Sequence, residues 1–195
     1  MESLESPSPT KRKRKWIRWT LLIALPVVLL ALVALTFNLG VRAYGFWPYY
    51  TPSKAMAPTL QQGDRFFMDA RAYLRAAPQR GDVMVFVREE TGKTLWVKRV
   101  IAIGGDVIQG ANDTVTLNGK ILSEPYVAPV DASEAVPDPF GPVAVPAGKL
   151  FVMGDNRHNS NDSRYFGFVD VKNVRGKVAL IFFSKDASRN WTRVH

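Results

Sequence analysis

The hydrophobic pattern divides the chain into one long apolar run and a following region of short apolar runs. No charged residue occurs from Thr20 through Val41, and about 20 apolar residues suffice to cross the hydrocarbon core of a bilayer. We therefore expect a transmembrane helix at residues 19–43, after a basic tail at residues 1–18 and before a domain at residues 44–195. A cleavable signal peptide is the alternative, but the run is long for one and no clear small-x-small cleavage site follows it.

After residue 44 the apolar residues come in short runs separated by turn residues, which is typical of a mostly β fold. Asn118-Gly119 lies between two such runs and predicts a hairpin with a type I′ turn, because both residues accept positive φ. Residues 70–77 are expected to form a short helix or a loop. Six prolines in residues 124–147 predict an excursion that pairs with no strand. The runs expected to form strands are 65–69, 83–87, 94–103, 114–117, 120–122, 150–153 and 178–183.

The composition narrows the possible chemistry. The chain has no cysteine, which excludes disulfides, thiol nucleophiles and thiolate metal ligands. Its two histidines, His158 and His195, nearly exclude a multi-histidine metal site or a Ser-His-Asp triad. A hydrolase built on this chain would therefore need a different base.

The charge pattern bears on topology. Part of the net charge of +9 is concentrated at residues 11–15, directly before the apolar run, where basic residues indicate membrane orientation rather than nucleic-acid binding. This cluster predicts a cytoplasmic N-terminus and an extracytoplasmic domain. Aromatic residues at positions 46–50 are expected at the far headgroup level of the bilayer.

Lys98 is the candidate base. On a strand it shares one face with three apolar residues, Trp96, Val100 and Ala102. Burial among such residues would lower the pKa of Lys98 and supply a neutral amine, whereas the neighbouring Arg99 stays protonated and cannot act as a base. Taken alone, the pattern more often indicates a strand lysine whose ammonium reaches solvent or pairs with a carboxylate.

Three segments resemble motifs of the type I signal peptidases. Residues 51–60 (TPSKAMAPTL) match the family's Pro-Ser-x-Ser-Met-x-Pro-Thr-Leu, except that Ala55 stands in place of the second serine. Residues 96–101 (WVKRVI) resemble the segment with the family's general-base lysine, and residues 154–167 (GDNRHNSNDSRYFG) resemble its Gly-Asp-Asn-Arg motif. The motifs follow in the family's order over most of the expected domain, so the chain is identified as a member by resemblance.

The resemblance implies roles for particular residues. Ala55 would occupy the position of the nucleophile of a Ser/Lys dyad, with Lys98 as general base. The hydroxyl of Ser53 and the backbone N–H of residue 55 would form the oxyanion hole, which stabilises the negative oxygen of the tetrahedral intermediate. Met56 matches the motif beside the nucleophile and is expected to support it.

The third motif would support the base. By resemblance Ser160 would hydrogen-bond to the amine of Lys98 and orient it, and Asp162 and Arg164 would form an ion pair that fixes the loop. Asp162 is expected to face Arg164 more than Lys98, since a contacting carboxylate would raise the pKa of the lysine. A solvated polar turn and a calcium-binding loop are the alternatives. A plain turn suits residues 154–156 taken alone, whereas the calcium motif fails because Arg157 stands at a ligand position and Ser160 stands where that motif needs glycine.

The implied protein is a membrane-bound peptidase that cleaves signal peptides from exported preproteins after small residues. We expect it in a bacterial inner membrane, with preproteins and the lipid bilayer as partners, no nucleic acid, and neither a metal nor an organic cofactor. Because Ala55 lacks the nucleophilic hydroxyl, the first interpretation is an inactivated form of such a peptidase. A natural noncatalytic homologue that binds signal peptides is the second. Ser53 as a displaced nucleophile is the third.

Overall fold

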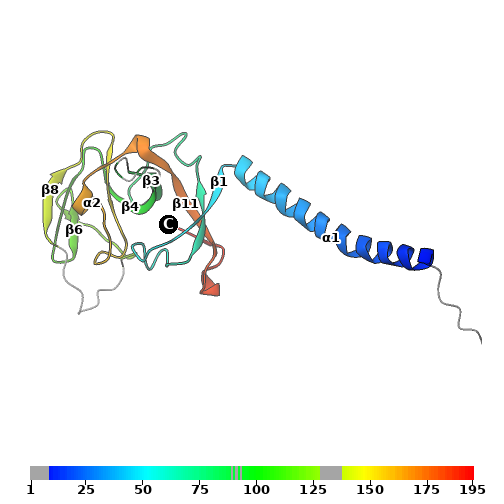
Figure 1. The fold of residues 1–195 in the computed structure, drawn as a ribbon. Coiled ribbons are helices and arrows are strands. Elements are labelled where there is room, and N and C mark those ends of the chain that lie inside the picture. Colours follow the sequence, from blue (N-terminus) through cyan, green and yellow to red (C-terminus); the bar gives the residue numbers. More distant parts are fainter. Residues whose placement is uncertain (1–8, 89, 91, 93, 128–137) are drawn as a thin grey trace, which may run out of the picture. The chain divides into compact units, whose positions relative to one another are not determined.

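The chain consists of two compact units, Met1–Tyr44 and Gly45–His195. A computed structural model describes residues 9–88, 90, 92, 94–127 and 138–195 (Figure 1). In the first unit helix α1 spans Pro9–Ala43, so it begins inside the expected basic tail, and Pro26 lies within it without ending it. Among the described residues, α1 alone is long and apolar enough to cross a membrane, with a window at Ala24–Val41 of mean hydropathy 2.3.

The second unit, Gly45–His195, contains two antiparallel sheets. In the larger sheet the strand order is β1-β2-β11-β3-β4-β9-β10, and β12 pairs with β11. Its strands are β1 Phe46–Tyr50, β2 Arg65–Asp69, β3 Val83–Val87, β4 Leu95–Ile103, β9 Lys149–Met153, β10 Val169–Asp170, β11 Val174–Phe183 and β12 Thr192–Arg193. Short helical turns are α2 Ser163–Phe166, η2 Val171–Asn173 and η3 Ala187–Arg189.

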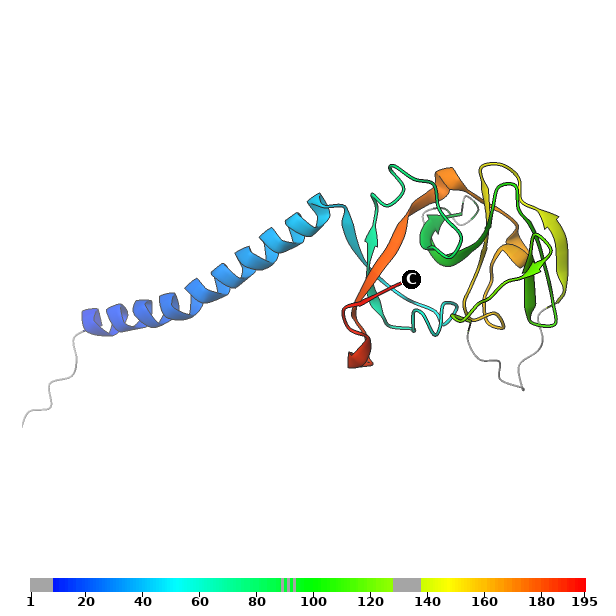
Figure 2. The same ribbon diagram turned by 180° about the vertical axis from the view of Figure 1, so that it is seen from behind.

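The smaller sheet has the order β7-β6-β5-β8. Its strands are β5 Val107–Ala111, β6 Thr114–Leu117, β7 Lys120–Ile121 and β8 Phe140–Ala144. Both views of the ribbon place β6 and β8 at the end of this unit that lies away from β1 (Figures 1 and 2). The sheets thus occupy different ends of one β domain.

The mostly β fold predicted from the sequence is confirmed. Strands β2 and β3 have the predicted boundaries, and the predicted run at 94–103 forms β4. The hairpin turn is also confirmed, because Asn118 and Gly119 have φ of 54° and 77° between β6 and β7. Residues 70–77 form turns and bends rather than a helix.

The prediction that residues 124–147 pair with no strand is wrong. Phe140–Ala144 forms β8 and pairs antiparallel with β5. Proline is tolerated there because β8 is an edge strand, where a missing N–H breaks no central ladder. The middle of the excursion, 128–137, lies outside the described residues.

Two residues of the segment 51–60 anchor it in the apolar core. Met56 and Leu60 are 2% and 0% exposed and pack in one cluster with Phe66, Val85 and Val178, among others. The residues before Met56 stay nearer the surface, since Pro52, Ser53 and Lys54 are exposed. The core therefore fixes the segment while leaving its N-terminal part accessible.

Candidate active site

A cavity of about 420 Å³ lies between the segment 51–56, β1 and the start of β4. Ser53, Ala55, Met56 and Lys98 all line it, so the fold brings the expected catalytic positions from two distant parts of the chain to one cavity. Cavities of roughly 300–1,000 Å³ are typical of ligand sites. The volume thus suits a short stretch of extended peptide.

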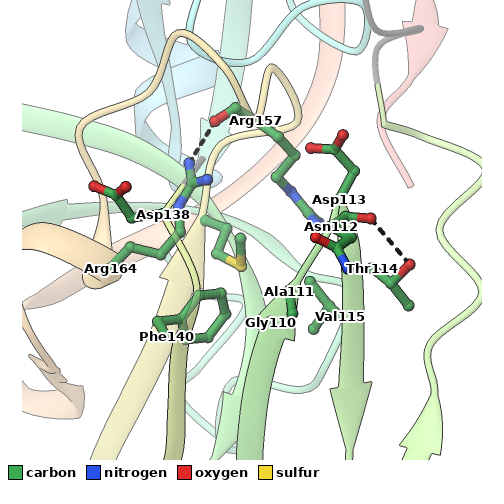
Figure 3. Close-up of a pocket in the computed structure, with 11 residues that line it drawn as sticks. Gly110, Ala111, Asn112, Asp113, Thr114, Val115, Asp138, Phe140, Arg157 and Arg164 are labelled. Atoms are coloured by element: carbon green, nitrogen blue, oxygen red, sulfur yellow. Dashed lines mark hydrogen bonds between the residues drawn. The ribbon is translucent and has the colours of Figure 1, made fainter. Parts of the chain in front are cut away.

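Two other cavities contain none of the expected nucleophile, base or oxyanion residues. One of about 420 Å³ is lined by residues of the 70–78 loop together with Val171, Val174 and Arg175. The other, between Phe140, Arg157 and Arg164, has a volume of only about 20 Å³ (Figure 3). That is room for about one water molecule, so it cannot hold a peptide.

Lys98 is buried at the wall of the first cavity. It is 3% exposed, lies opposite Met84 of β3, and places its Nζ 6.0 Å from the centre of the Trp96 ring. Burial lowers the pKa of Lys98 to about 8, an effect opposed by the charges of Asp162 and Asp155 and strengthened by Arg164. No carboxylate of the described residues forms an ion pair with this amine, so the more common surface-lysine interpretation does not hold.

Arg99, the next residue on β4, is equally buried but has a different environment. It is 1% exposed, and its guanidinium forms a two-bond ion pair with Asp155, with distances of 2.8 and 2.7 Å. The same group also donates to Gly81 and His195 carbonyl oxygens. Burial alone therefore does not distinguish a base from a structural cation. The ion-pair partner does, because Arg99 has a carboxylate partner and Lys98 has none among the described residues.

The alternation predicted for β4 holds only in part. Trp96 and Val100 pack in one cluster, as expected, but Ala102 packs with Ile101 in another. The cause is an irregularity in the pairing of β4 with β9 between Val100 and Ala102, because a bulge turns later side chains to the opposite face. Lys98 precedes this point, so its predicted orientation is unaffected.

The backbone N–H and the backbone carbonyl oxygen of residue 55 both form hydrogen bonds. Its N–H donates to Ser53 Oγ at 3.4 Å, so the two groups expected to form the oxyanion hole are adjacent. Its carbonyl oxygen accepts a hydrogen bond of 3.2 Å from the N–H of Asn156 in the third motif. Ala55 is partly buried and lines the cavity.

The third motif is fixed by buried charges. Asp162, which is 0% exposed, binds Arg164 with a shortest distance of 2.8 Å and also accepts the N–H of Gly154 at 3.0 Å. Arg164 donates in addition to the Arg157 carbonyl oxygen at 2.7 Å (Figure 3). The expected ion pair is thus present, and Asp162 faces Arg164.

Ser160 lies close to residue 55. A Cβ placed on Gly154 would be 2.3 Å from Ser160 Oγ and 2.4 Å from the Ala55 carbonyl oxygen, so glycine is what allows this approach. The Ser160 hydroxyl is buried and has no hydrogen-bond partner among the described residues. A hydrogen bond from Ser160 to Lys98 therefore stays a prediction.

Some residues around the site were not predicted from the sequence. Asn159 and Asn161 line the cavity opposite β4, and Tyr49 and Tyr50 reach it from β1. Arg157 is held by Glu124 at 2.5 and 2.8 Å, across a long sequence separation. The motif spacing could have indicated the two asparagines, but the other contacts appear only once the chain has folded.

Comparison with known proteins identifies the family. The chain is similar to a signal peptidase I of Bacillus licheniformis, with 38% identity over 89% of this chain and 92% of that one. It is also 38% identical to signal peptidase I P of Bacillus subtilis subsp. natto, over 92% and 97% of the two chains. A solved signal peptidase I from Enterococcus faecalis is 37% identical, with a TM-score of 0.45 over 51% of this chain and 95% of that one.

The family model described as signal peptidase, peptidase S26, matches residues 16–183, which is most of the chain. The chain therefore belongs to the S26 signal peptidase family. The match includes all three motifs and ends at the last residue of β11.

Proposed function

We propose that this chain is a membrane-anchored signal peptidase I whose machinery for cleaving signal peptides is complete except for the nucleophilic hydroxyl at position 55. The observation that carries the proposal is the shared cavity, in which Ala55 and the buried amine of Lys98 line one wall. The burial that lowers the pKa of Lys98 to about 8 leaves a sizeable neutral fraction near that pH. A neutral amine beside the nucleophile position is what a lysine base requires.

A serine at position 55 defines the reaction. Its Oγ would attack the carbonyl carbon of the scissile peptide bond while Lys98 Nζ takes the hydroxyl proton. The carbonyl oxygen would become negative between the Ser53 hydroxyl and the N–H of residue 55. The protonated Lys98 would return the proton to the departing amine, leaving an ester at residue 55. Water, deprotonated by Lys98, would then hydrolyse the ester and release the signal peptide.

The membrane is part of the proposal. Helix α1 would span the bilayer with the basic residues 11–15 in the cytoplasm, and Gly45–His195 would then lie on the outer side of a bacterial inner membrane. Preproteins being exported expose their cleavage junction on that side. The three parts would be a tail at 1–18, the span at 19–43 and the peptidase domain at 44–195.

Restoring the hydroxyl tests this function. The full-length Ala55→Ser variant in liposomes should cleave a preprotein whose signal peptide ends in Ala-x-Ala, and the chain with Ala55 should not. Adding Lys98→Ala to Ala55→Ser should lower kcat by roughly 10⁴-fold or more, as loss of a catalytic residue does. Absence of cleavage by the Ala55→Ser variant, with its fold intact by circular dichroism, would exclude a peptidase.

A noncatalytic role is the second candidate, and Ala55 itself favours it. The cavity is lined by Tyr49, Tyr50, Trp96 and other residues whose contacts with a peptide need no nucleophilic hydroxyl, so a signal peptide could bind without being cut. The unmodified chain should then bind a fluorescent signal peptide. Binding by this chain, together with no cleavage by the Ala55→Ser variant, would favour a binding protein over an inactivated peptidase.

A further inference from the structure

The chain around position 55 is held by few regular contacts. The segment 51–64 belongs to no strand or long helix, and its backbone forms isolated bonds such as Leu60 N–H to the Met56 carbonyl oxygen at 2.7 Å. Its ends are joined by Thr51 N–H and the Asp64 carbonyl oxygen at 2.8 Å. The geometry of residue 55 therefore depends on side chains that reach this segment from elsewhere.

Arg189 reaches it from the distant turn η3. Its Nη1 donates to the Pro58 carbonyl oxygen, and its Nη2 donates to the Thr59 carbonyl oxygen, both at 2.9 Å. The same Nη2 lies 2.9 Å from Oδ2 of Asp64, a carboxylate that is 2% exposed and also accepts the N–H of Gln61. One guanidinium thus holds two backbone carbonyl oxygens and a buried carboxylate of the same segment.

Thr59 connects this contact to the strand of the base. Arg99, adjacent to Lys98 on β4, donates from its Nη2 to Thr59 Oγ1 at 3.2 Å. Arg189 binds the carbonyl oxygen of the same residue. Thr59 is therefore held both from the strand that carries Lys98 and from η3, which fixes the distance between the nucleophile segment and the base.

The turn that carries Arg189 is itself well held. Asp186 caps it by accepting the N–H and the hydroxyl of Ser188, at 3.1 and 2.7 Å. Asn190 Oδ1 accepts the N–H of Ser184 at 2.7 Å, and the following strand β12 pairs with β11. Arg189 consequently projects from a defined backbone rather than from a loose end.

We propose that Arg189 is a positioning residue that sets the placement of the nucleophile at position 55 relative to Lys98. The residue lies beyond residues 16–183, which the family model matches, and outside the three motifs. The proposal rests on the proposed function only for its effect on cleavage. An error of about 1 Å in the placement of reacting groups costs roughly a hundredfold in rate, which is the size of effect that this role requires.

Cleavage kinetics give the first test, in the full-length chain with Ala55→Ser. Arg189→Ala should lower kcat by roughly a hundredfold with KM nearly unchanged, because the substrate cavity does not include Arg189. Arg189→Lys should recover part of the loss, since a lysine ammonium keeps the charge but lacks the planar guanidinium that binds two carbonyl oxygens at once. The control is Arg193→Ala, which removes an equal charge from an exposed position on β12 and should leave kcat unchanged. An equal loss in both alanine variants would overturn the proposal.

Hydrogen exchange gives a second test that needs no activity. In the unmodified chain, Arg189→Ala should speed exchange at the amides of Ala57, Leu60 and Gln61 by at least tenfold, while β3 and β4 keep their rates. Faster exchange throughout the domain, or none at these amides, would show a general structural role or no role and would overturn the proposal. If the Ala55→Ser variant cuts nothing, the proposed function fails, and exchange alone decides the role of Arg189.

Discussion

The backbone N–H of Asn156 donates to the carbonyl oxygen of Ala55 at 3.2 Å. This bond joins the third motif to the nucleophile position directly. Gly154, two residues earlier, is bound to Asp162 through its own N–H and lies against both Ser160 and Ala55. The buried pair of Asp162 and Arg164 thus supports position 55 through the backbone of this loop.

A substitution at Gly154 should therefore displace residue 55. Gly154→Ala would place a Cβ 2.4 Å from the Ala55 carbonyl oxygen, which is backbone and must move. In the Ala55→Ser variant we expect kcat to fall by roughly a hundredfold, the cost of about 1 Å of misplacement. Steady-state cleavage of a preprotein measures the change.

The matched control is Gly40→Ala in helix α1, where a new Cβ would meet nothing within 4 Å. This variant should cleave at the parent rate. If Gly154→Ala also cleaves at the parent rate, the loop does not fix the position of residue 55.

The rate of the Ala55→Ser variant should depend on pH through Lys98. Only the neutral amine accepts a proton, and burial lowers the pKa of Lys98 to about 8. Well below that pH, kcat/KM should fall about tenfold for each pH unit, and above it the rate should level off. A plateau that begins near the ordinary lysine value of about 10.4 would show that burial does not prepare this base.

The strands that the sequence predicted best are those with local signals. Residues 65–69 and 83–87 are short apolar runs that each follow a Gly-Asp turn, and both form strands with those boundaries. Strand β5 was missed because Gln109 and Gly110 interrupt its apolar pattern. Its pairing depends on the ring of Phe140, which occupies the space where a Cβ of Gly110 would lie. Such a contact cannot be read from either segment alone.

The candidate site likewise contains residues that the sequence identified and contacts that it did not. Strand alternation alone did not identify Lys98, but a family motif did, and the structure places it in the cavity with Ala55. The partners of Arg99 and Arg189 were not predicted. Asp155 and Asp64 are far from them in sequence, and no periodicity connects residues whose contact arises from the pairing of distant strands.

Substitutions of Ser53 distinguish its role as an oxyanion donor from its role as a displaced nucleophile. Its Oγ lies 3.4 Å from the N–H of residue 55, so both can point at one oxygen of the substrate. In the Ala55→Ser variant, Ser53→Ala should lower kcat by roughly a hundred- to a thousandfold, as loss of one oxyanion donor does. Ser53→Thr keeps the hydroxyl and should retain most of the rate.

The chain with Ala55 provides the opposite test for Ser53. The Ser53 hydroxyl accepts the N–H of residue 55, as expected of an oxyanion donor, so Ser53 should not replace the missing nucleophile. We expect no cleavage by this chain in a long incubation with a preprotein, followed by mass spectrometry of the products. Cleavage by this chain that disappears in Ser53→Ala would instead identify Ser53 as the nucleophile. The chain has no hydroxyl at position 55, and an oxyanion donor alone forms no covalent intermediate.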